Sequence, residues 1–193
     1  MRQLIFVFGL VFVSQSLFAG DLEAVIASVE CRQSGSAAPV DILENIRKQA
    51  PSIALLVFTA PWCAACRKLE NKLSNQGGLI GSDVRLFFLS LEQRPGQQVD
   101  KKKPKQARFP SESRLKRFPT GTFFSCTPVG SASKSLSLRI PVYFLMNAGR
   151  LDTQFKGFSG ANVGLLARRL SWLRGNEAAS LDPAFEDSID DEE

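Results

Sequence analysis

Histidine is absent from this chain of 193 residues. Its absence excludes a Cys–His nucleophilic pair, acid–base catalysis by an imidazole and every metal site with a histidine ligand. One tyrosine accompanies fifteen phenylalanines, which predicts an aromatic core with few phenolic hydroxyls. A membrane-spanning helix needs about 20 consecutive apolar residues, and no apolar run after the N-terminal segment comes near that length. What remains is a chain of ordinary apolar content, long enough for one domain with a sizeable core.

The first 19 residues have the pattern of a secretory signal peptide. Arg2 supplies a positive charge, residues 4–13 form an apolar stretch, and Ala19 provides a small residue at the expected cleavage site. We therefore expect residues 1–19 to be removed and the mature protein to be periplasmic or secreted, where disulfides persist. An uncleaved membrane anchor is the alternative that this pattern leaves open.

Charge is distributed unevenly along the chain. Nine basic residues and two acidic ones lie between Arg94 and Arg117, whereas the last twelve residues hold seven acids and no base. The ordinary interpretation is a solvated basic loop and a disordered acidic tail over residues 181–193. The alternatives are that the tail shields the loop, or that the loop binds an acidic partner. Nucleic-acid binding is disfavoured because no aromatic residues alternate with the basic ones as a stacking platform.

Hydrophobic periodicity and turn residues predict alternating strands and helices. Residues 21–30 fit either a strand or a short helix. Residues 93–137 break the pattern and form a long insertion, with a short helix near 113–118 and an extended piece at 122–125. The other expected elements are a helix at 41–49, a strand at 53–59, a helix at 63–75, strands at 84–91, 138–146 and 151–158, a turn at 147–150, and a helix at 162–174.

Cys63 and Cys66 carry the clearest chemistry in the sequence. They lie where a buried strand passes into a helix, so that the first sulfur meets the unpaired amides and the positive end of the helix dipole. These groups favour a thiolate, and the second cysteine is one turn away, so the pair can form and break a disulfide reversibly. An inert disulfide and a metal half-site are the alternatives; two further zinc ligands would have to come from Cys31 and Cys126.

The order of these elements resembles the thioredoxin-like fold family over about residues 41–175. Three features carry the resemblance. Trp62-Cys63-Ala64-Ala65-Cys66 matches the active-site motif and Ile140-Pro141-Val142 the cis-proline segment. Gly149, and Gly157 with Phe158, lie where the family turns and enters its last helix. The resemblance implies an α/β three-layer sandwich with a mixed central sheet, a domain at 20–180 that contains the 93–137 insertion, and a cis-proline strand after that insertion. It also implies an exported thiol–disulfide oxidoreductase.

The resemblance further implies a role for each residue of the site. Cys63 is expected to be the attacking thiolate and Cys66 the buried resolving thiol. Trp62 is expected to pack beside the sulfurs. Pro141, if cis, leaves Ile140 free to bind a substrate chain, so that Trp62, Ile140 and Pro141 form the substrate-binding set.

Two departures from the family pattern bear on the activity. Many thioredoxins have a buried aspartate six residues before the first cysteine, where this chain has Val57. The residues between the cysteines are Ala64 and Ala65, which match neither the thioredoxins nor the strong oxidases. We therefore expect milder oxidising power than that of the oxidases. Arg67 and Lys68 follow the motif and favour the thiolate further.

Cys31 and Cys126 remain after the first pair is assigned. The predicted arrangement is a structural disulfide that joins two irregular regions, one before the fold and one in the insertion. The alternatives are a second redox pair that relays electrons to Cys63 and Cys66, or two separate buried thiols.

The predicted function is that of an exported thiol–disulfide oxidoreductase, which reduces or reshuffles disulfides in other exported proteins. Its expected partners are protein disulfides and a redox partner protein, with neither metal nor cofactor, no nucleic acid and at most transient membrane contact. The alternative is a non-catalytic thioredoxin-fold module that docks an acidic partner through its basic insertion.

Overall fold

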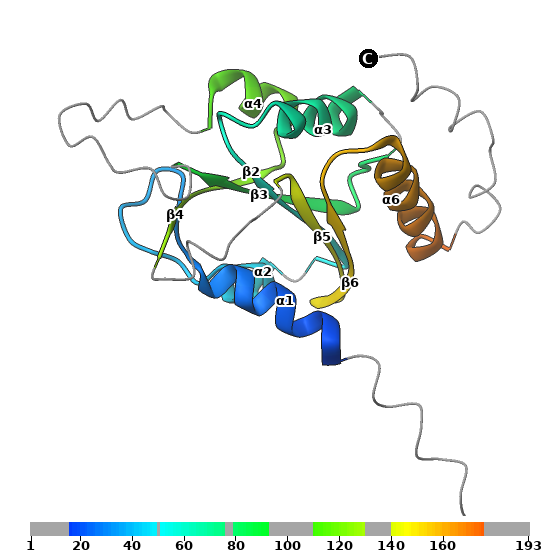
Figure 1. The fold of residues 1–193 in the computed structure, drawn as a ribbon, viewed down its shortest axis with the longest axis horizontal. Helices are drawn as coiled ribbons and strands as arrows, with labels where there is room; N and C mark the ends of the chain where they lie inside the picture. The colour runs from blue at the N-terminus through cyan, green and yellow to red at the C-terminus, as the bar shows by residue number, and fades with distance from the viewer. Residues whose placement is uncertain (1–15, 50, 76–78, 93–109, 130–139, 176–193) are drawn as a thin grey trace, which may run out of the picture.

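Six strands form one sheet through the centre of the molecule, in the order β1-β4-β3-β2-β5-β6 (Figure 1). β2, β3 and β4 are parallel to one another, whereas β1, β5 and β6 are antiparallel to their neighbours. The sheet is therefore mixed, as predicted. The strands are β1 (Val29–Gln33), β2 (Ile53–Thr59), β3 (Val84–Leu91), β4 (Thr122–Pro128), β5 (Val142–Asn147) and β6 (Arg150–Lys156).

Helices cover both faces of this sheet in the computed structural model, which describes residues 16–49, 51–75, 79–92, 110–129 and 140–175. One face carries α1 (Ser16–Ala27) and α2 (Ile42–Gln49). The other carries α3 (Ala64–Asn75), α4 (Glu112–Arg117) and α6 (Gly160–Leu173), as Figure 1 shows. These three layers confirm the predicted α/β sandwich. No helix among the described residues has both the length and the apolar character needed to cross a bilayer.

The burial of β2 shows that the sheet is covered by helices on both of its faces. Every residue of β2 is buried, and alternate side chains enter opposite cores because successive residues of a strand point to opposite faces. Leu56 and Phe58 pack into the core beneath α1 and α2. Leu55 and Val57 pack into the core beneath α3 and α6. A strand covered on both faces has no polar side, as its sequence indicated.

Local signals in the sequence set several element boundaries. Asp41 caps α2, because its Oδ1 accepts a hydrogen bond of 2.9 Å from the backbone N–H of Glu44. Ala148 and Gly149 form the turn between β5 and β6 with positive φ angles of 47° and 75°, the combination that a two-residue hairpin turn favours. Gly175 ends α6 with a positive φ of 74°.

The structure corrects three expectations. Pro141 precedes β5 instead of lying inside a strand, because a residue without a backbone N–H cannot contribute to a ladder. Residues 21–30 divide between the end of α1 and the start of β1. Cys31 and Cys126 lie on β1 and β4, which are neighbouring strands of the sheet and not irregular regions. The acidic tail, residues 1–15 of the signal peptide and residues 93–109 and 130–137 of the insertion lie outside the described residues, as do residues 138–139 at the start of the strand predicted over 138–146.

Candidate active site

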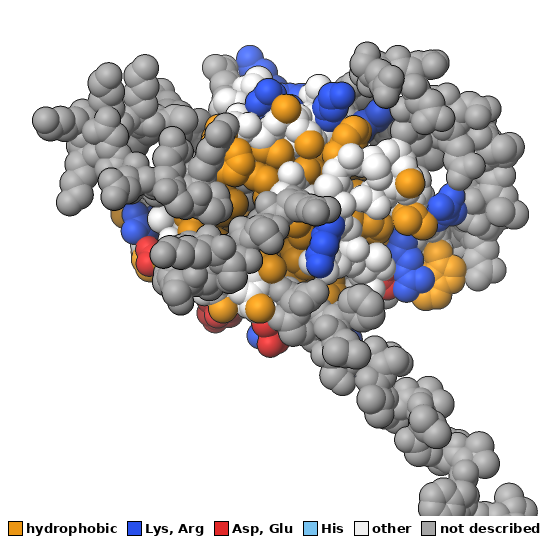
Figure 2. Space-filling model, viewed as in Figure 1, with side chains coloured by type: hydrophobic (Ala, Val, Ile, Leu, Met, Phe, Trp, Pro, Cys, Tyr) orange, Lys and Arg blue, Asp and Glu red, His pale blue; other side chains and the backbone are white. Residues whose placement is uncertain are grey.

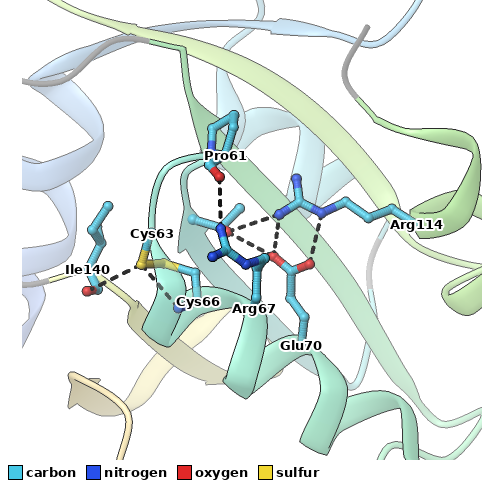
Figure 3. Close-up of a disulfide and its surroundings, with 8 residues drawn as sticks. Pro61, Cys63, Cys66, Arg67, Glu70, Arg114 and Ile140 are labelled. Atoms are coloured by element: carbon cyan, nitrogen blue, oxygen red, sulfur yellow. Dashed lines mark hydrogen bonds and ion pairs between the residues drawn. A yellow bond between two sulfur atoms is a disulfide. The ribbon is translucent and has the colours of Figure 1, made fainter. Parts of the chain in front are cut away.

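Cys63 and Cys66 form a disulfide at the N-terminal end of α3, with an S–S distance of 2.07 Å (Figure 3). The backbone carbonyl of Cys63 accepts the N–H of Arg67 at 3.3 Å, so Cys63 occupies the position that caps the helix. The N–H of Cys66 points to the Cys63 sulfur at 3.0 Å. After reduction, this amide and the helix dipole would stabilise a thiolate on Cys63.

The two cysteine residues differ in their exposure to solvent. The exposed fraction of Cys63 is 7 %, whereas that of Cys66 is 0 %. A partner molecule can therefore reach the disulfide from the side of Cys63. This asymmetry is what the proposed division into an attacking and a resolving cysteine requires.

The segment Ile140-Pro141 faces the disulfide from the start of β5. Its peptide bond is cis, as the family resemblance predicted. The carbonyl oxygen of Ile140 lies 3.6 Å from the sulfur of Cys63, although the two residues are 77 positions apart in the sequence. Ile140 and Trp62 are partly exposed and Pro141 is buried. Of the three predicted substrate-binding residues, Ile140 contacts the disulfide, Pro141 follows Ile140 in the chain, and Trp62 directly precedes Cys63. Their role in substrate binding stays a prediction.

A buried ion pair, which the sequence analysis did not identify, lies further along α3 than the disulfide (Figure 3). Glu70 is one turn after Cys66 and 1 % exposed. Arg114 of α4 donates to both of its carboxylate oxygens, from Nε at 2.8 Å and from NH2 at 2.6 Å. The hydroxyl of Thr59, at the end of β2, donates to Glu70 Oε1 at 2.8 Å. This network fastens α4 to the active-site helix and to the strand before it.

One feature of the sequence could have indicated a buried charge at Glu70. Cys66, Glu70 and Leu73 follow one another at helical spacing, so a charged residue occupies an otherwise buried stripe of α3. A buried carboxylate needs a partner. The partner itself, 44 positions away, could not be identified from that spacing.

Val57 lies where many thioredoxins have a buried aspartate, and it is fully buried in the apolar core. That position therefore offers no group to move a proton. Among the described residues, no three side chains of the cysteine, aspartate and glutamate types are grouped so that they could hold a metal ion. All four cysteines are in disulfides.

Cys31 and Cys126 form the second disulfide, at directly opposed positions of β1 and β4. Their exposed fractions are 2 % and 0 %. The bond therefore lies within the core between the sheet and α1 and α2. This burial favours the predicted structural role over a second redox pair, because burial in an apolar core hinders attack by an external thiol.

Comparison with known proteins finds no matching family profile and no matching curated protein. Solved structures with a similar chain path include a thioredoxin-like protein in its oxidized form, with 14 % identity over 76 % of this chain and 88 % of that one and a TM-score of 0.47. StoA from Bacillus subtilis shares 18 % identity over 76 % and 96 % of the two chains, with a TM-score of 0.39. A putative thiol:disulfide interchange protein DsbE from Chlorobium tepidum shares 16 % identity over 73 % and 90 %, with a TM-score of 0.43.

Likenesses at this level of identity concern the path of the chain and not its activity. The assignment of the fold depends on the features described above: the parallel β2–α3–β3 unit, the antiparallel β5–β6 hairpin, the final helix and a Cys-x-x-Cys disulfide opposite a cis-proline. On these features, the chain has a thioredoxin-like fold.

Proposed function

We propose that this protein is an exported thiol–disulfide oxidoreductase, which acts on disulfides of other exported proteins through the Cys63–Cys66 pair. One observation carries the proposal. The disulfide caps α3 with its more accessible sulfur, that of Cys63, 3.6 Å from the carbonyl oxygen of Ile140 in the cis-proline segment. A purely structural disulfide has no need of an accessible sulfur at a helix N-terminus facing a second segment of the chain.

In the proposed reaction, the reduced protein transfers two electrons to its client. The Cys63 thiolate attacks one sulfur of the client disulfide, a mixed disulfide forms, and the other client sulfur leaves as a thiolate that takes a proton from water. Cys66 then loses its proton, and its thiolate attacks the Cys63 sulfur. The Cys63–Cys66 disulfide forms and the second client thiolate is released. An external dithiol of a redox partner protein would return the pair to its reduced state.

Trp62, Ile140 and Pro141 would hold the client during this exchange. The Ile140 carbonyl lies beside the Cys63 sulfur, so a client cysteine that is bonded to Cys63 must pass next to it. Trp62 and Ile140 are partly exposed and pack against the core cluster that contains both cysteines. They offer apolar contacts to a client bound at Cys63.

Export is the part of the proposal that depends on residues 1–19. Fractionation of cells that express the full chain is expected to recover the protein outside the cytoplasm, shortened at Ala19. A variant with Arg2→Glu and Leu10→Arg is expected to stay in the cytoplasm at full length, because it lacks the charge and the apolar run of a signal peptide. Cytoplasmic recovery of the unaltered chain would contradict export without affecting the redox proposal.

Insulin reduction tests the enzymatic proposal. The unaltered protein is expected to accelerate precipitation of insulin by dithiothreitol, and Cys63→Ser is expected to reduce that acceleration at least about a hundredfold, because no attacking thiolate remains. Cys66→Ser is expected to accumulate a mixed disulfide that mass spectrometry detects. A Lys48→Gln variant, which changes an exposed residue of α2 away from the disulfide, is the control and should keep the activity. Equal rates for the unaltered protein and Cys63→Ser would refute the proposal.

A further inference from the structure

We propose that the preferred clients of this site are disulfides flanked by acidic residues, which dock on basic side chains at the surface of α3 and α4. This proposal rests on the proposed function and names its substrate class. We call the docking region the basic surface, and it consists of the partly exposed Lys72 and the exposed Arg67, Lys68, Lys116 and Arg117.

The basic surface begins beside the disulfide. Arg67 and Lys68 come directly after Cys66 in the first two turns of α3, and both are exposed. The guanidinium of Arg67 donates from NH1 to the carbonyl oxygen of Pro61 at 3.1 Å, which holds it against the loop that leads to Cys63 (Figure 3). A carboxylate a few residues from a client disulfide therefore lies within the roughly 8–10 Å over which charges interact at physiological salt.

α3 itself carries no exposed acidic side chain. Glu70, the acid of α3, is buried and paired with Arg114, so that pair contributes no net charge to the surface. Apart from this pair, the sequences of α3 and α4 hold five basic residues and one acidic residue, Glu112.

α4 presents its charges at a fixed position relative to the disulfide. Arg114 makes a two-pronged, buried contact with Glu70 of α3. One turn later, Arg117 NH1 donates to Asn71 Oδ1 of α3 at 2.6 Å. Because these contacts join α4 to the active-site helix, a client that meets Lys116 and Arg117 is held in a defined relation to Cys63.

The opposite helical layer does not share this charge. Figure 2 shows basic side chains along the upper edge, over α3 and α4, and further ones at the centre and right of the view, while the few acidic side chains in view lie mostly at the lower left, on the side of α1 and α2. The span from Leu22 to Gln49 holds four acids, Glu23, Glu30, Asp41 and Glu44, and three bases, Arg32, Arg47 and Lys48. A field with one positive side steers acidic ligands to that side and raises their association rate.

Three model peptides test this inference, each with the same internal disulfide, flanked by glutamate, glutamine or lysine. The reduced protein is mixed with each peptide and the rate of peptide reduction is measured. We expect the glutamate peptide to react on the order of tenfold faster than the lysine peptide at about 20 mM salt, with the glutamine peptide between them. The difference is expected to shrink at about 500 mM salt because ions screen the field.

A charge-reversal variant assigns the effect to the basic surface. Lys72→Glu with Lys116→Glu is expected to abolish or invert the ratio between the rates for the glutamate and the lysine peptide, whatever the rate for the glutamine peptide. Arg47→Glu with Lys48→Glu is the matched control. It changes the net charge equally, but on α2 at the other face of the sheet, and should keep the preference.

The possible outcomes separate the two proposals. Reduction of all three peptides at equal rates would overturn the inference and leave the proposed function intact. Reduction of none would overturn the proposed function. A third variant replaces the seven acids of residues 182–193 by their amides in the full chain. If the preference appears only in that variant, the chain's own tail occupies the basic surface, and the proposal for acidic clients is wrong.

Discussion

Glu70 is a buried carboxylate on an otherwise apolar stripe of the active-site helix, and the charge of Arg114 compensates it. Both side chains are at least nine-tenths buried, with exposed fractions of 1 % and 8 %. Burial of a charge is costly unless a partner and additional hydrogen bonds satisfy it, and Thr59 supplies a further hydrogen bond here. The pair helps to fix the positions of α3, α4 and the end of β2 relative to one another, because its hydrogen bonds join all three.

Removal of one partner is predicted to be much worse than removal of both. Arg114→Leu leaves the Glu70 carboxylate buried without compensation and is expected to lower the free energy of unfolding by about 3–5 kcal/mol. Glu70→Leu combined with Arg114→Leu should recover a large part of that loss. Urea unfolding of the two variants measures both values. A double variant as unstable as Arg114→Leu alone would contradict this account.

Tyr143 has a buried hydroxyl for which no described group serves as a hydrogen-bond partner. Burial raises the pKa of this hydroxyl well above its usual range. Tyr143→Phe removes an unsatisfied polar group and keeps the ring, which stacks on Phe155 with centroids 4.8 Å apart. We expect the free energy of unfolding to rise by about 1 kcal/mol, seen as a higher Tm. Tyr143→Leu is the control and should be destabilising, since it loses the stacked ring.

At the scale of elements, α6 is held in place by two arginines. One lies within the helix and contacts the sheet, and the other is its C-terminal cap and contacts the loop before β3. Arg169 of α6 donates to both oxygens of Asp152 on β6, at 2.7 and 2.6 Å. Arg174, the residue after α6, binds Asp83 in the loop before β3, at 2.7 and 3.0 Å. These contacts complement the apolar packing of α6 on the sheet.

The Asp152–Arg169 pair predicts a pH-dependent stability. Burial alone would raise the pKa of Asp152, but hydrogen bonds from Arg169 and Thr153 outweigh it and lower the pKa below its usual 3.8. The folded state thus binds the proton more weakly than the unfolded state. This contribution to stability is present above about pH 4 and is lost as the pH falls through the folded-state pKa.

Asp152→Asn is therefore expected to be less stable than the unaltered protein at pH 7, by a margin that shrinks as the pH falls below about 4. Urea unfolding at a series of pH values measures the margin. A margin that is the same at pH 7 and at acid pH would show that the carboxylate charge does not cause it. Arg150→Gln, an exposed change on the same strand, is the control and should show no such trend.

For the whole molecule, the Cys31–Cys126 disulfide is the longest covalent constraint, with a sequence separation of 95. It joins the edge strand β1 to β4 and closes most of the domain into a loop. In the loop-entropy account, a bond that closes a loop of this length stabilises the folded state by restricting the unfolded chain, by about 4–5 kcal/mol.

Removal of this disulfide is accordingly predicted to destabilise the protein more than removal of the other one. Cys31→Ala with Cys126→Ala is expected to lower the free energy of unfolding by up to about 5 kcal/mol. Cys63→Ala with Cys66→Ala opens a loop with a separation of only 3 and should cost less than half as much. Equal losses, measured by guanidinium unfolding under oxidising conditions, would contradict the loop-entropy explanation.

Much of the element order could be predicted from the sequence because the signals are local. The apolar run from Ile53 to Phe58, followed by Thr59, predicted both ends of β2 correctly. The glycine and the asparagine around Ala148 gave the β5–β6 turn. The short helix and the extended piece expected within the insertion correspond to α4 and the start of β4. Each signal depends on residues within a few positions of one another.

The place of β4 in the sheet could not be predicted in that way. β4 lies between β3 and β1, with Phe124 opposite Leu89 of β3, and this pairing depends on packing and not on any local pattern. The same reason explains why Cys31 and Cys126 were expected in irregular regions. The stretch around Thr122 has too few residues of alternating character to indicate a fully paired interior strand.

By itself the sequence determined that two cysteines lie one turn apart at a strand-to-helix junction, since a run of apolar residues and a helical repeat are properties of neighbouring residues. Only the tertiary structure decided what surrounds them. Ile140 reaches the Cys63 sulfur across 77 positions, and Arg114 reaches Glu70 across 44. Contacts of that range arise from the way the sheet and its helices pack, and no spacing within one segment encodes them.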